Sequence, residues 1–407
     1  MAIDNKDKKV LNVPPLRFPE FSGEWKKCTI GELAIKVGSG VTPRGGESVY
    51  KMDGHPFVRS QNVGLGHLIL DDIAFIDEET HLRQKSTELK LEDVLLNITG
   101  ASIGRSALVN EQVVGGNVNQ HVCIIRTKES LIPSFLCNFL LSNYGQRQID
   151  SFQAGGNRQG LNFEQIKSIK IAIPSTKEQT KVAKLLQLIE ERIATQNKII
   201  EDLKKLKSAI SKQVFAQEPN GWSRLDTLFS KGKAGGTPTS TNKEYYNGEI
   251  PFLSINDITK QGKYVRYTEN HLSQSGLENS SAWVVPKYSL IMSMYASVGL
   301  VTINEIPITT SQAMFAMQLK DKDLLDYLYY YLSYFKYRHI HKYLETGTQS
   351  NINADIVRGI MIPTYGHSRN MEIASTLQDI DVKIDNELSV LKLFNRQKNY
   401  LLSQMFI

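Results

Sequence analysis

The sequence contains the same series of short motifs twice. Pro56 and the residues around it return at Pro251, 195 residues later, and the Thr-Pro pair at Thr42 returns at Thr237 with the same offset. A period of this length exceeds the roughly 20–50 residues of solenoid repeats. The chain of 407 residues is therefore predicted to hold two copies of one domain, in line with a domain size of roughly 100–200 residues.

The offset shortens toward the end of each copy. It is 192 between Gln120 and Gln312 and 189 between Pro174 and Pro363. Insertions and deletions of this kind fall in surface loops, where they are tolerated. We therefore align Pro174 with Pro363, each of which closes the last predicted strand of its copy.

The predicted elements follow the same order in both copies. Short β-like runs alternate with Gly-, Asn- and Ser-rich turns and are followed by one helical segment, a pattern typical of an α/β (α+β) domain. A longer helical region then ends each copy. The predicted parts are an N-terminal arm at 1–23, globular domains at 24–173 and 217–362, and helical regions at 174–216 and 363–407.

The two helical regions carry matching apolar positions. Residues 177–215 contain neither Pro nor Gly, and their apolar residues recur in alternating steps of three and four. This spacing is typical of a coiled-coil seam, which needs a second helix to cover it. The predicted seam consists of Leu186, Ile189, Ile193, Ile200, Leu203, Ile210 and Val214 in the first region, and of Leu377, Ile380, Ile384, Leu391, Phe394, Leu401 and Met405 in the second.

We expect the two regions to pair with each other as an antiparallel coiled coil with pseudo-twofold symmetry, which would act as a spacer. A helix of about 40 residues is about 60 Å long. Ser175 and Glu178 form a capping-box pattern that predicts where the first helix begins. The alternative is an ordinary bundle core, which the duplication of the whole unit makes less favoured.

Several motifs, in this order, resemble the specificity (S) subunit of type I restriction-modification enzymes over nearly the entire chain. They are LRFPEFSGEWKKCTIGEL near the start, the pair PFVRSQNV and PFLSINDI, the turns GASIG and YASVG, and GGNRQGLNFEQIKSIKIAIPSTKEQ before the first long helix. No single motif is decisive. Their repeated order, with a long helix after each copy, is highly specific.

The resemblance implies a non-catalytic DNA-binding protein. Each globular domain would be a target recognition domain that reads one half of a bipartite, asymmetric double-stranded DNA sequence, and the helices would set the unread gap. The chain would dock two modification (methyltransferase) subunits, which bind S-adenosylmethionine and methylate adenine. Two restriction (translocase and nuclease) subunits would join them with ATP and Mg²⁺. No cofactor is expected on this chain itself.

Polar residues on the predicted loops are the candidates for contact with DNA. Arg pairs with guanine and Asn or Gln with adenine in the major groove, while solvation or a turn hydrogen bond is the alternative for any single residue. The first copy offers Arg44, Arg59, Gln61, Asn62, Arg105, Asn119, Gln120, Asn157, Arg158 and Gln159, and the second Thr239, Asn242, Lys243, Ser254, Asn256, Tyr295, Gln312, Gln349, Ser350 and Asn351.

Composition and charge bear on the kind of partner the chain binds and on the state of its cysteines. The net charge of +6 suits a nucleic-acid partner without requiring one. Lys204, Lys205 and Lys207 could follow phosphates or simply line a solvated helix face. The three cysteines are scattered without CxxC spacing, which argues for reduced thiols and against a disulfide framework or a zinc site.

The start of the chain has no apolar signal segment, and no stretch reaches the ~18 apolar residues of a membrane span, so we expect a cytoplasmic protein. We find no phosphate-binding loop, no catalytic residues and no metal site in the sequence. A two-headed coiled-coil adaptor that binds only proteins is the competing hypothesis. A nuclease ranks last, because carboxylate and metal-ligand clusters are lacking.

Overall fold

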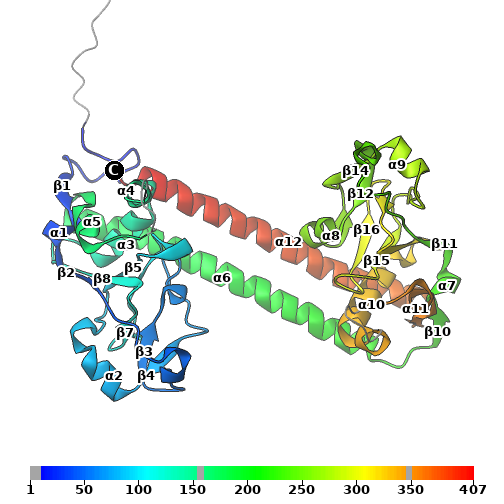
Figure 1. Cartoon of the computed structure of the whole chain (residues 1–407), viewed down its shortest axis with the longest axis horizontal. Helices are drawn as coiled ribbons and strands as arrows, with labels where there is room; N and C mark the ends of the chain where they lie inside the picture. The colour runs from blue at the N-terminus through cyan, green and yellow to red at the C-terminus, as the bar shows by residue number, and fades with distance from the viewer. Residues whose placement is uncertain (1–10, 154–159, 345–350) are drawn as a thin grey trace, which may run out of the picture. The chain divides into compact units, whose positions relative to one another are not determined.

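The computed structural model describes residues 11–153, 160–344 and 351–407. These residues form two compact units, Met1–Asn197 with Ser389–Ile407 (unit 1) and Lys198–Leu388 (unit 2). Each long helix, α6 (Thr176–Phe215) and α12 (His367–Gln404), contributes one part to unit 1 and the other part to unit 2 (Figure 1). No helix among these residues is both long and apolar enough to cross a membrane.

Unit 1 contains a four-stranded, a three-stranded and a two-stranded sheet. Its sheets have the strand orders β2-β8-β5-β6, β4-β3-β7 and β1-β9, and β3 runs parallel to β7. In chain order its elements before α6 are β1 (Lys26–Thr29), α1 (Ile30–Leu33), β2 (Ala34–Ser39), β3 (His55–Val58), β4 (Ala74–Ile76), α2 (Glu78–Arg83), β5 (Val94–Asn97), β6 (Ser106–Leu108), β7 (Asn117–Val118), β8 (Val122–Thr127), α3 (Pro133–Leu141), α4 (Asn143–Ser151), α5 (Phe163–Ser168) and β9 (Lys170–Ile173).

Unit 2 repeats this topology with one additional strand. Its sheets have the orders β11-β18-β15-β16-β13, β14-β12-β17 and β10-β19, and β12 runs parallel to β17. Between α6 and α12 lie β10 (Gly221–Arg224), α7 (Leu225–Leu228), β11 (Phe229–Ala234), β12 (Tyr246–Leu253), α8 (Ile255–Gln261), β13 (Tyr264–Val265), β14 (Asn270–Leu272), α9 (Gln274–Glu278), β15 (Leu290–Ser293), β16 (Val301–Asn304), β17 (Thr309–Thr310), β18 (Met314–Leu319), α10 (Leu324–Arg338), α11 (Ala354–Gly359) and β19 (Met361–Thr364). The predicted duplication and mixed α/β class are confirmed.

The strand pairing corrects one part of the sequence alignment. Lys27 lies opposite Ala172 in the β1-β9 pair, and Trp222 lies opposite Pro363 in the β10-β19 pair. Pro363 therefore occupies the place of Ala172, and the alignment of Pro174 with Pro363 is wrong by two residues. Because side chains alternate with a period of two along a strand, a slip of two residues preserves the pattern on which the alignment relied.

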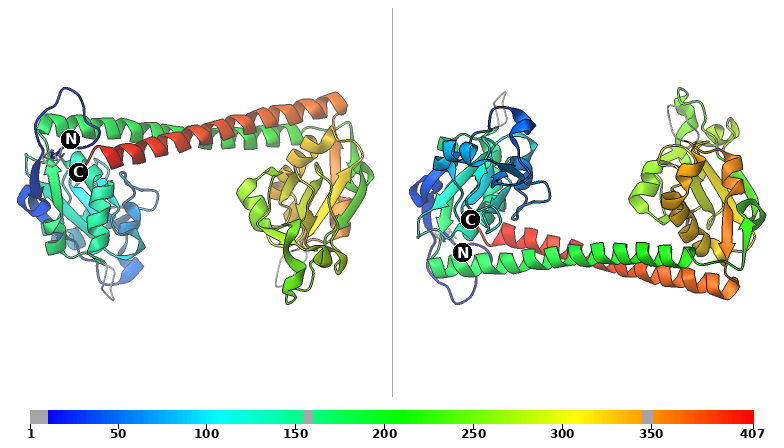
Figure 2. Two further views of the ribbon diagram at one scale, coloured as in Figure 1. Left: turned by 90° about the horizontal axis from the view of Figure 1, so that it is seen from above. Right: turned by 90° about the horizontal axis from the view of Figure 1, so that it is seen from below.

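The two long helices pack against each other within each unit. In unit 1, Leu186 and Ile189 from the start of α6 share one hydrophobic core with Leu401 and Met405 from the end of α12, and Figure 2 shows these two segments side by side. In unit 2, the end of α6 packs in the same core as Leu377 from the start of α12. The pairing is thus antiparallel in both units. All of the predicted seam residues are buried or half-buried.

Two equivalent ion pairs interrupt this seam. Lys398 pairs with Glu190 in unit 1, and Lys207 pairs with Asp381 at 2.5 Å in unit 2. Each lysine and each acid lies 191 residues from its counterpart. Charged residues at a buried seam favour the register that pairs them, because any other register leaves a charge without its partner.

An aromatic ring anchors the C-terminal end of each long helix, at Phe215 in the last turn of α6 and at Phe406 just after α12. Phe406, fully buried, contacts Phe135 and Phe139 of α3 with ring centroids 5.1 and 6.2 Å apart. In unit 2, Phe215 at the end of α6 contacts Tyr331 of α10 at 5.3 Å. Tyr327, Tyr330 and Tyr331 of α10 belong to the core of unit 2.

The start of α6 is held by a buried ion pair rather than by a complete capping box. The Ser175 hydroxyl accepts a hydrogen bond from the Glu178 backbone N–H at 3.4 Å, as predicted. The buried Glu178 carboxylate, however, accepts two hydrogen bonds from Arg17 at 2.7 and 2.8 Å and one from the Trp25 indole at 3.2 Å. Hydrogen bonding to Glu178 raises the pKa of Arg17. The equivalent residue in unit 2 is Arg369, which pairs with its own helix.

Replacing Phe406 with alanine would leave a cavity in the core of unit 1. We expect Phe406→Ala to lower the free energy of unfolding by about 3–5 kcal/mol, measured by urea denaturation of the chain. Tyr400→Ala, at an exposed position near the end of α12, is the matched control and should change it by less than about 0.5 kcal/mol. Equal effects of the two substitutions would contradict the anchoring role of Phe406.

Removing the Glu178 carboxylate would leave the Arg17 guanidinium without its acidic partner. We expect Glu178→Ala to lower the free energy of unfolding by about 3 kcal/mol, since breaking a buried pair leaves an uncompensated charge. The control is Glu164→Ala, which removes an exposed pair with Lys167 and should cost less than about 1 kcal/mol. The same denaturation curves would measure both, and a small effect at Glu178 would refute this account.

Candidate nucleic-acid interface

Most described candidate residues gather at one edge of the three-stranded sheet in each unit. In unit 1, Val58 of β3 lies beside Val118 of the parallel strand β7, so the residues after both strands emerge at the same edge. In unit 2, Leu253 of β12 lies beside Thr310 of β17 in the same way. Carboxyl ends of adjacent parallel strands are a common place for ligand binding. We call these two edges the strand-end sites.

A cavity of about 490 Å³ opens at the strand-end site of unit 1. Gln61 and Arg105 line it together with Thr99, Ser102 and His121, which were not among the candidates. His121 directly follows the candidate Gln120, and Ser102 lies in the repeated GASIG turn, whereas Thr99 had no separate signal in the sequence. The His121 ring contacts the Thr99 hydroxyl at 2.6 Å, so the cavity wall is hydrogen-bonded within itself.

A glutamine is held by the Thr-Pro loop at both sites. The Gln120 side-chain oxygen accepts a hydrogen bond from the Thr42 backbone N–H at 2.9 Å and another from the Thr42 hydroxyl. The Gln312 oxygen accepts one from the Thr237 hydroxyl at 2.5 Å. In unit 1 the Gln120 amide group can then only donate to a ligand, because its oxygen is already occupied.

A second exposed amide at each site is bonded to a carboxylate. Gln61 donates to Asp72 in unit 1, and Asn256 donates to Glu269 at 3.0 Å in unit 2. The Arg59 guanidinium also binds Asp72 at 3.1 Å. Most of the Arg59 side chain is covered, so this arginine holds the loop in place rather than projecting from it.

Some candidate residues are turned inward. Asn62 is 1% exposed, accepts a hydrogen bond from the Arg59 backbone N–H at 2.9 Å and donates to the Ile69 carbonyl at 2.9 Å. Asp257, at the equivalent position of unit 2, is also buried and accepts from the Ser254 backbone N–H at 2.8 Å. Asn119 is buried as well. These side chains brace the strand-end loops, and we set them apart from the residues that can touch DNA.

The turn that carries Tyr295 is strained. Ala296 and Ser297 have positive φ values of 38° and 54°, which are unfavourable for residues with a Cβ atom. The Ser293 hydroxyl supports the turn by donating to the Tyr295 and Ala296 carbonyl oxygens at 2.5 and 2.9 Å. Tyr295 itself is 41% exposed, so the turn presents a large aromatic ring to solvent.

The remaining candidates are dispersed. Arg44 and Thr239 are exposed on loops, and Lys243 is exposed in the short 3-10 helix Lys243–Tyr245. The half-buried Asn242 caps this helix by accepting a hydrogen bond from the Glu244 backbone N–H at 3.1 Å. Among the helix lysines, Lys205 pairs with Glu201 and Lys207 with Asp381. Five candidates lie outside the described residues, namely Asn157, Arg158, Gln159, Gln349 and Ser350, while Asn351 is half-buried.

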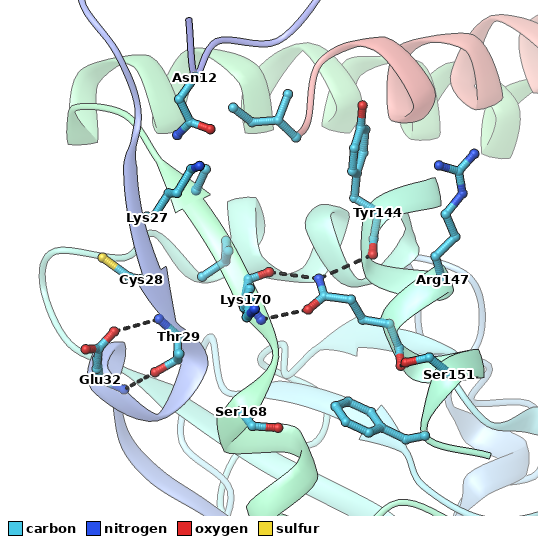
Figure 3. Close-up of a pocket in the computed structure, with 15 residues that line it drawn as sticks. Asn12, Lys27, Cys28, Thr29, Glu32, Tyr144, Arg147, Ser151, Ser168 and Lys170 are labelled. Atoms are coloured by element: carbon cyan, nitrogen blue, oxygen red, sulfur yellow. Dashed lines mark hydrogen bonds between the residues drawn. The ribbon is translucent and has the colours of Figure 1, made fainter. Parts of the chain in front are cut away.

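A wider groove in unit 1 lies beside β1, β9 and α4 and has a volume of about 970 Å³ (Figure 3). Lys27, Arg147 and Lys170 contribute positive charge to it. The Gln148 amide bridges the Lys170 backbone with two hydrogen bonds of 2.8 Å. No candidate DNA-binding residue is among the residues that line this groove, so it is separate from the strand-end site.

The three cysteines are buried in the core of unit 1. Burial raises the pKa of Cys123 to about 12 and that of Cys137 to about 11, so neither thiol is activated. Cys28 is buried too. In the part of the chain that the structure describes, no three His, Cys, Asp or Glu side chains converge to hold a metal ion.

Comparisons with known proteins match the chain over nearly its whole length. A relative from Methanocaldococcus jannaschii, described as the type I restriction enzyme MjaX specificity subunit, is 22% identical over 402 residues, which cover 93% of this chain and 91% of that protein. The crystal structure of the S subunit of a type I restriction-modification system from M. genitalium superposes with a TM-score of 0.58 at 15% identity, covering 97% of this chain and 99% of that one.

A further solved chain comes from work on complex assembly and conformational transition of the type I R-M system. It superposes with a TM-score of 0.61 at 18% identity, covering 95% of this chain and 98% of that one. At these identities the structures establish the fold alone. The profile of the family described as "Type I restriction modification DNA specificity domain" matches residues 22–205 and again residues 219–391. The chain therefore belongs to the type I restriction modification DNA specificity domain family, whose domain it carries twice.

Proposed function

We propose that each strand-end site reads one half of a bipartite, asymmetric DNA sequence. The observation that carries this proposal is that both units build the same frame and place different side chains on it. Gln61 in unit 1 corresponds to Asn256 in unit 2, and Arg105 corresponds to Leu300. A frame with different exposed groups suits two different base sequences, because base edges are distinguished by their hydrogen-bonding groups.

As a type I specificity protein, the chain recognises DNA and leaves the chemistry to other subunits of its complex. Two modification subunits would bind S-adenosylmethionine and methylate adenine, and two restriction subunits would use ATP and Mg²⁺. Large apolar side chains outside the seam support docking of protein partners on the helices, since exposed apolar patches commonly mark interfaces. They are Leu188, Ile199 and Leu206 on α6 and Val382, Leu388, Leu393 and Tyr400 on α12.

The paired helices would set the number of unread base pairs between the half-sites. Helix α6 has 40 residues, which corresponds to a length of about 60 Å. An apolar seam with charged pairs at equivalent positions makes such a helix pair stiff and fixes its register. The gap is then determined by helix length and not by the loops that read bases.

Mapping methyladenine across the genome tests the proposed function. Cells with the gene should carry a split, asymmetric methylated motif that disappears when the gene is deleted. Unchanged methylation would contradict the proposal. The affinity of the purified complex with its modification subunits for this motif should also fall steeply with salt, because phosphate contacts release counterions. An adaptor that binds only proteins would show no such DNA affinity.

Lengthening both helices tests the spacer. Duplicating residues 191–197 of α6 and the equivalent residues 382–388 of α12 keeps the seven-residue seam repeat. It adds about 10 Å, so the unread gap should grow by about three base pairs while both half-sites stay the same. Duplication in α6 alone is the control and should abolish methylation, since the helices no longer match in length. An unchanged gap in the double variant would refute the spacer.

A further inference from the structure

The two strand-end sites share a carboxylate that fixes the orientation of an exposed amide. Asp72, just before β4, accepts a hydrogen bond from the Gln61 amide, and Glu269, just before β14, accepts one from Asn256 at 3.0 Å. An ionised carboxylate only accepts hydrogen bonds, so the nitrogen of each amide must be the atom that faces it. The orientation of both amides is therefore determined.

A basic residue completes each arrangement. Arg59 binds Asp72 at 3.1 Å in unit 1, and Lys260 binds Glu269 in unit 2. The hydrogen bonds from Lys260 and then Asn256 lower the pKa of Glu269, which keeps this carboxylate ionised. In the sequence, the basic residue Arg59 precedes Gln61 in unit 1, whereas Lys260 follows Asn256 in unit 2. The two units thus build the same arrangement from basic residues at non-equivalent positions. Duplication of one ancestral domain does not by itself explain this likeness.

Each amide keeps one N–H and its carbonyl oxygen for a ligand, because an amide group has two donors and one acceptor oxygen. In the major groove, adenine presents an N6 donor next to the N7 acceptor. Guanine presents acceptors only, cytosine a donor and thymine an acceptor. Of the four bases, adenine matches a neighbouring donor and acceptor. Gln120 differs, since its oxygen is already taken by Thr42.

We propose that Gln61 and Asn256 are specificity-determining residues that each read one adenine of their own half-site, donating to N7 and accepting from N6. Asp72 and Glu269 are positioning residues that hold these amides ready before DNA arrives. The inference rests on the proposed function and adds to it the base that each site recognises at one position.

The test uses the complete complex of the chain with its modification subunits and a duplex that carries its methylated motif. Each adenine of the motif is replaced in turn by 7-deazaadenine, which lacks the N7 acceptor, and affinities are measured for the wild type, Gln61→Ala and Asn256→Ala. For the wild type, one replacement in each half-site should cost about 5- to 150-fold in affinity. Gln61→Ala should abolish the loss in one half-site only, and Asn256→Ala in the other.

The control is Gln112→Ala, which removes an exposed side chain whose oxygen accepts a hydrogen bond from the Asn110 amide at 3.3 Å, and it should leave every loss in place. Losses that persist in both alanine variants, or a uniform loss of affinity for all duplexes, would overturn the inference. A wild-type complex without preference for the motif would instead overturn the proposed function.

Discussion

The apolar seam between α6 and α12 is the interaction on which each unit depends. In unit 1 it joins the core of the globular domain through Leu186 and Ile189, and in unit 2 the end of α6 joins the core through Phe215. Neither helix could keep this narrow apolar stripe in water, so each needs the other as its cover. The ion pairs Lys398–Glu190 and Lys207–Asp381 then favour one register of the two helices.

Bracing of the backbone and the proposed recognition of bases fall on neighbouring residues in the segments that follow β3 and β12. Asn62 and Asp257 are buried and hold the backbone after β3 and β12. The residues directly before them, Gln61 and Asn256, are exposed. The exposed side chains can therefore vary between the two copies without loss of the frame that positions them. Under the proposed function, this separation lets one fold serve two different half-sites.

Much of the architecture could be predicted from the sequence, because it depends on repetition and periodicity. The duplication, the mixed α/β class and the position of the first long helix all follow from repeated short motifs and from the spacing of apolar residues, which can be recognised in one sequence. The alignment of Pro174 with Pro363 was wrong because a two-residue slip leaves strand alternation unchanged. The complete capping box at Ser175 was wrong because Glu178 finds a stronger partner in Arg17, which is 161 residues away in the sequence.

The sequence by itself determined that the chain is duplicated, that its long helices share a seam and that polar loops follow particular strands. These features are local or periodic, so hydrophobic patterning suffices to define them. Only the tertiary structure decided which polar residues face solvent and which brace the loops. It alone placed Asp72 against Gln61 and Glu269 against Asn256, since contacts between separate segments of the chain depend on strand pairing that no local pattern encodes.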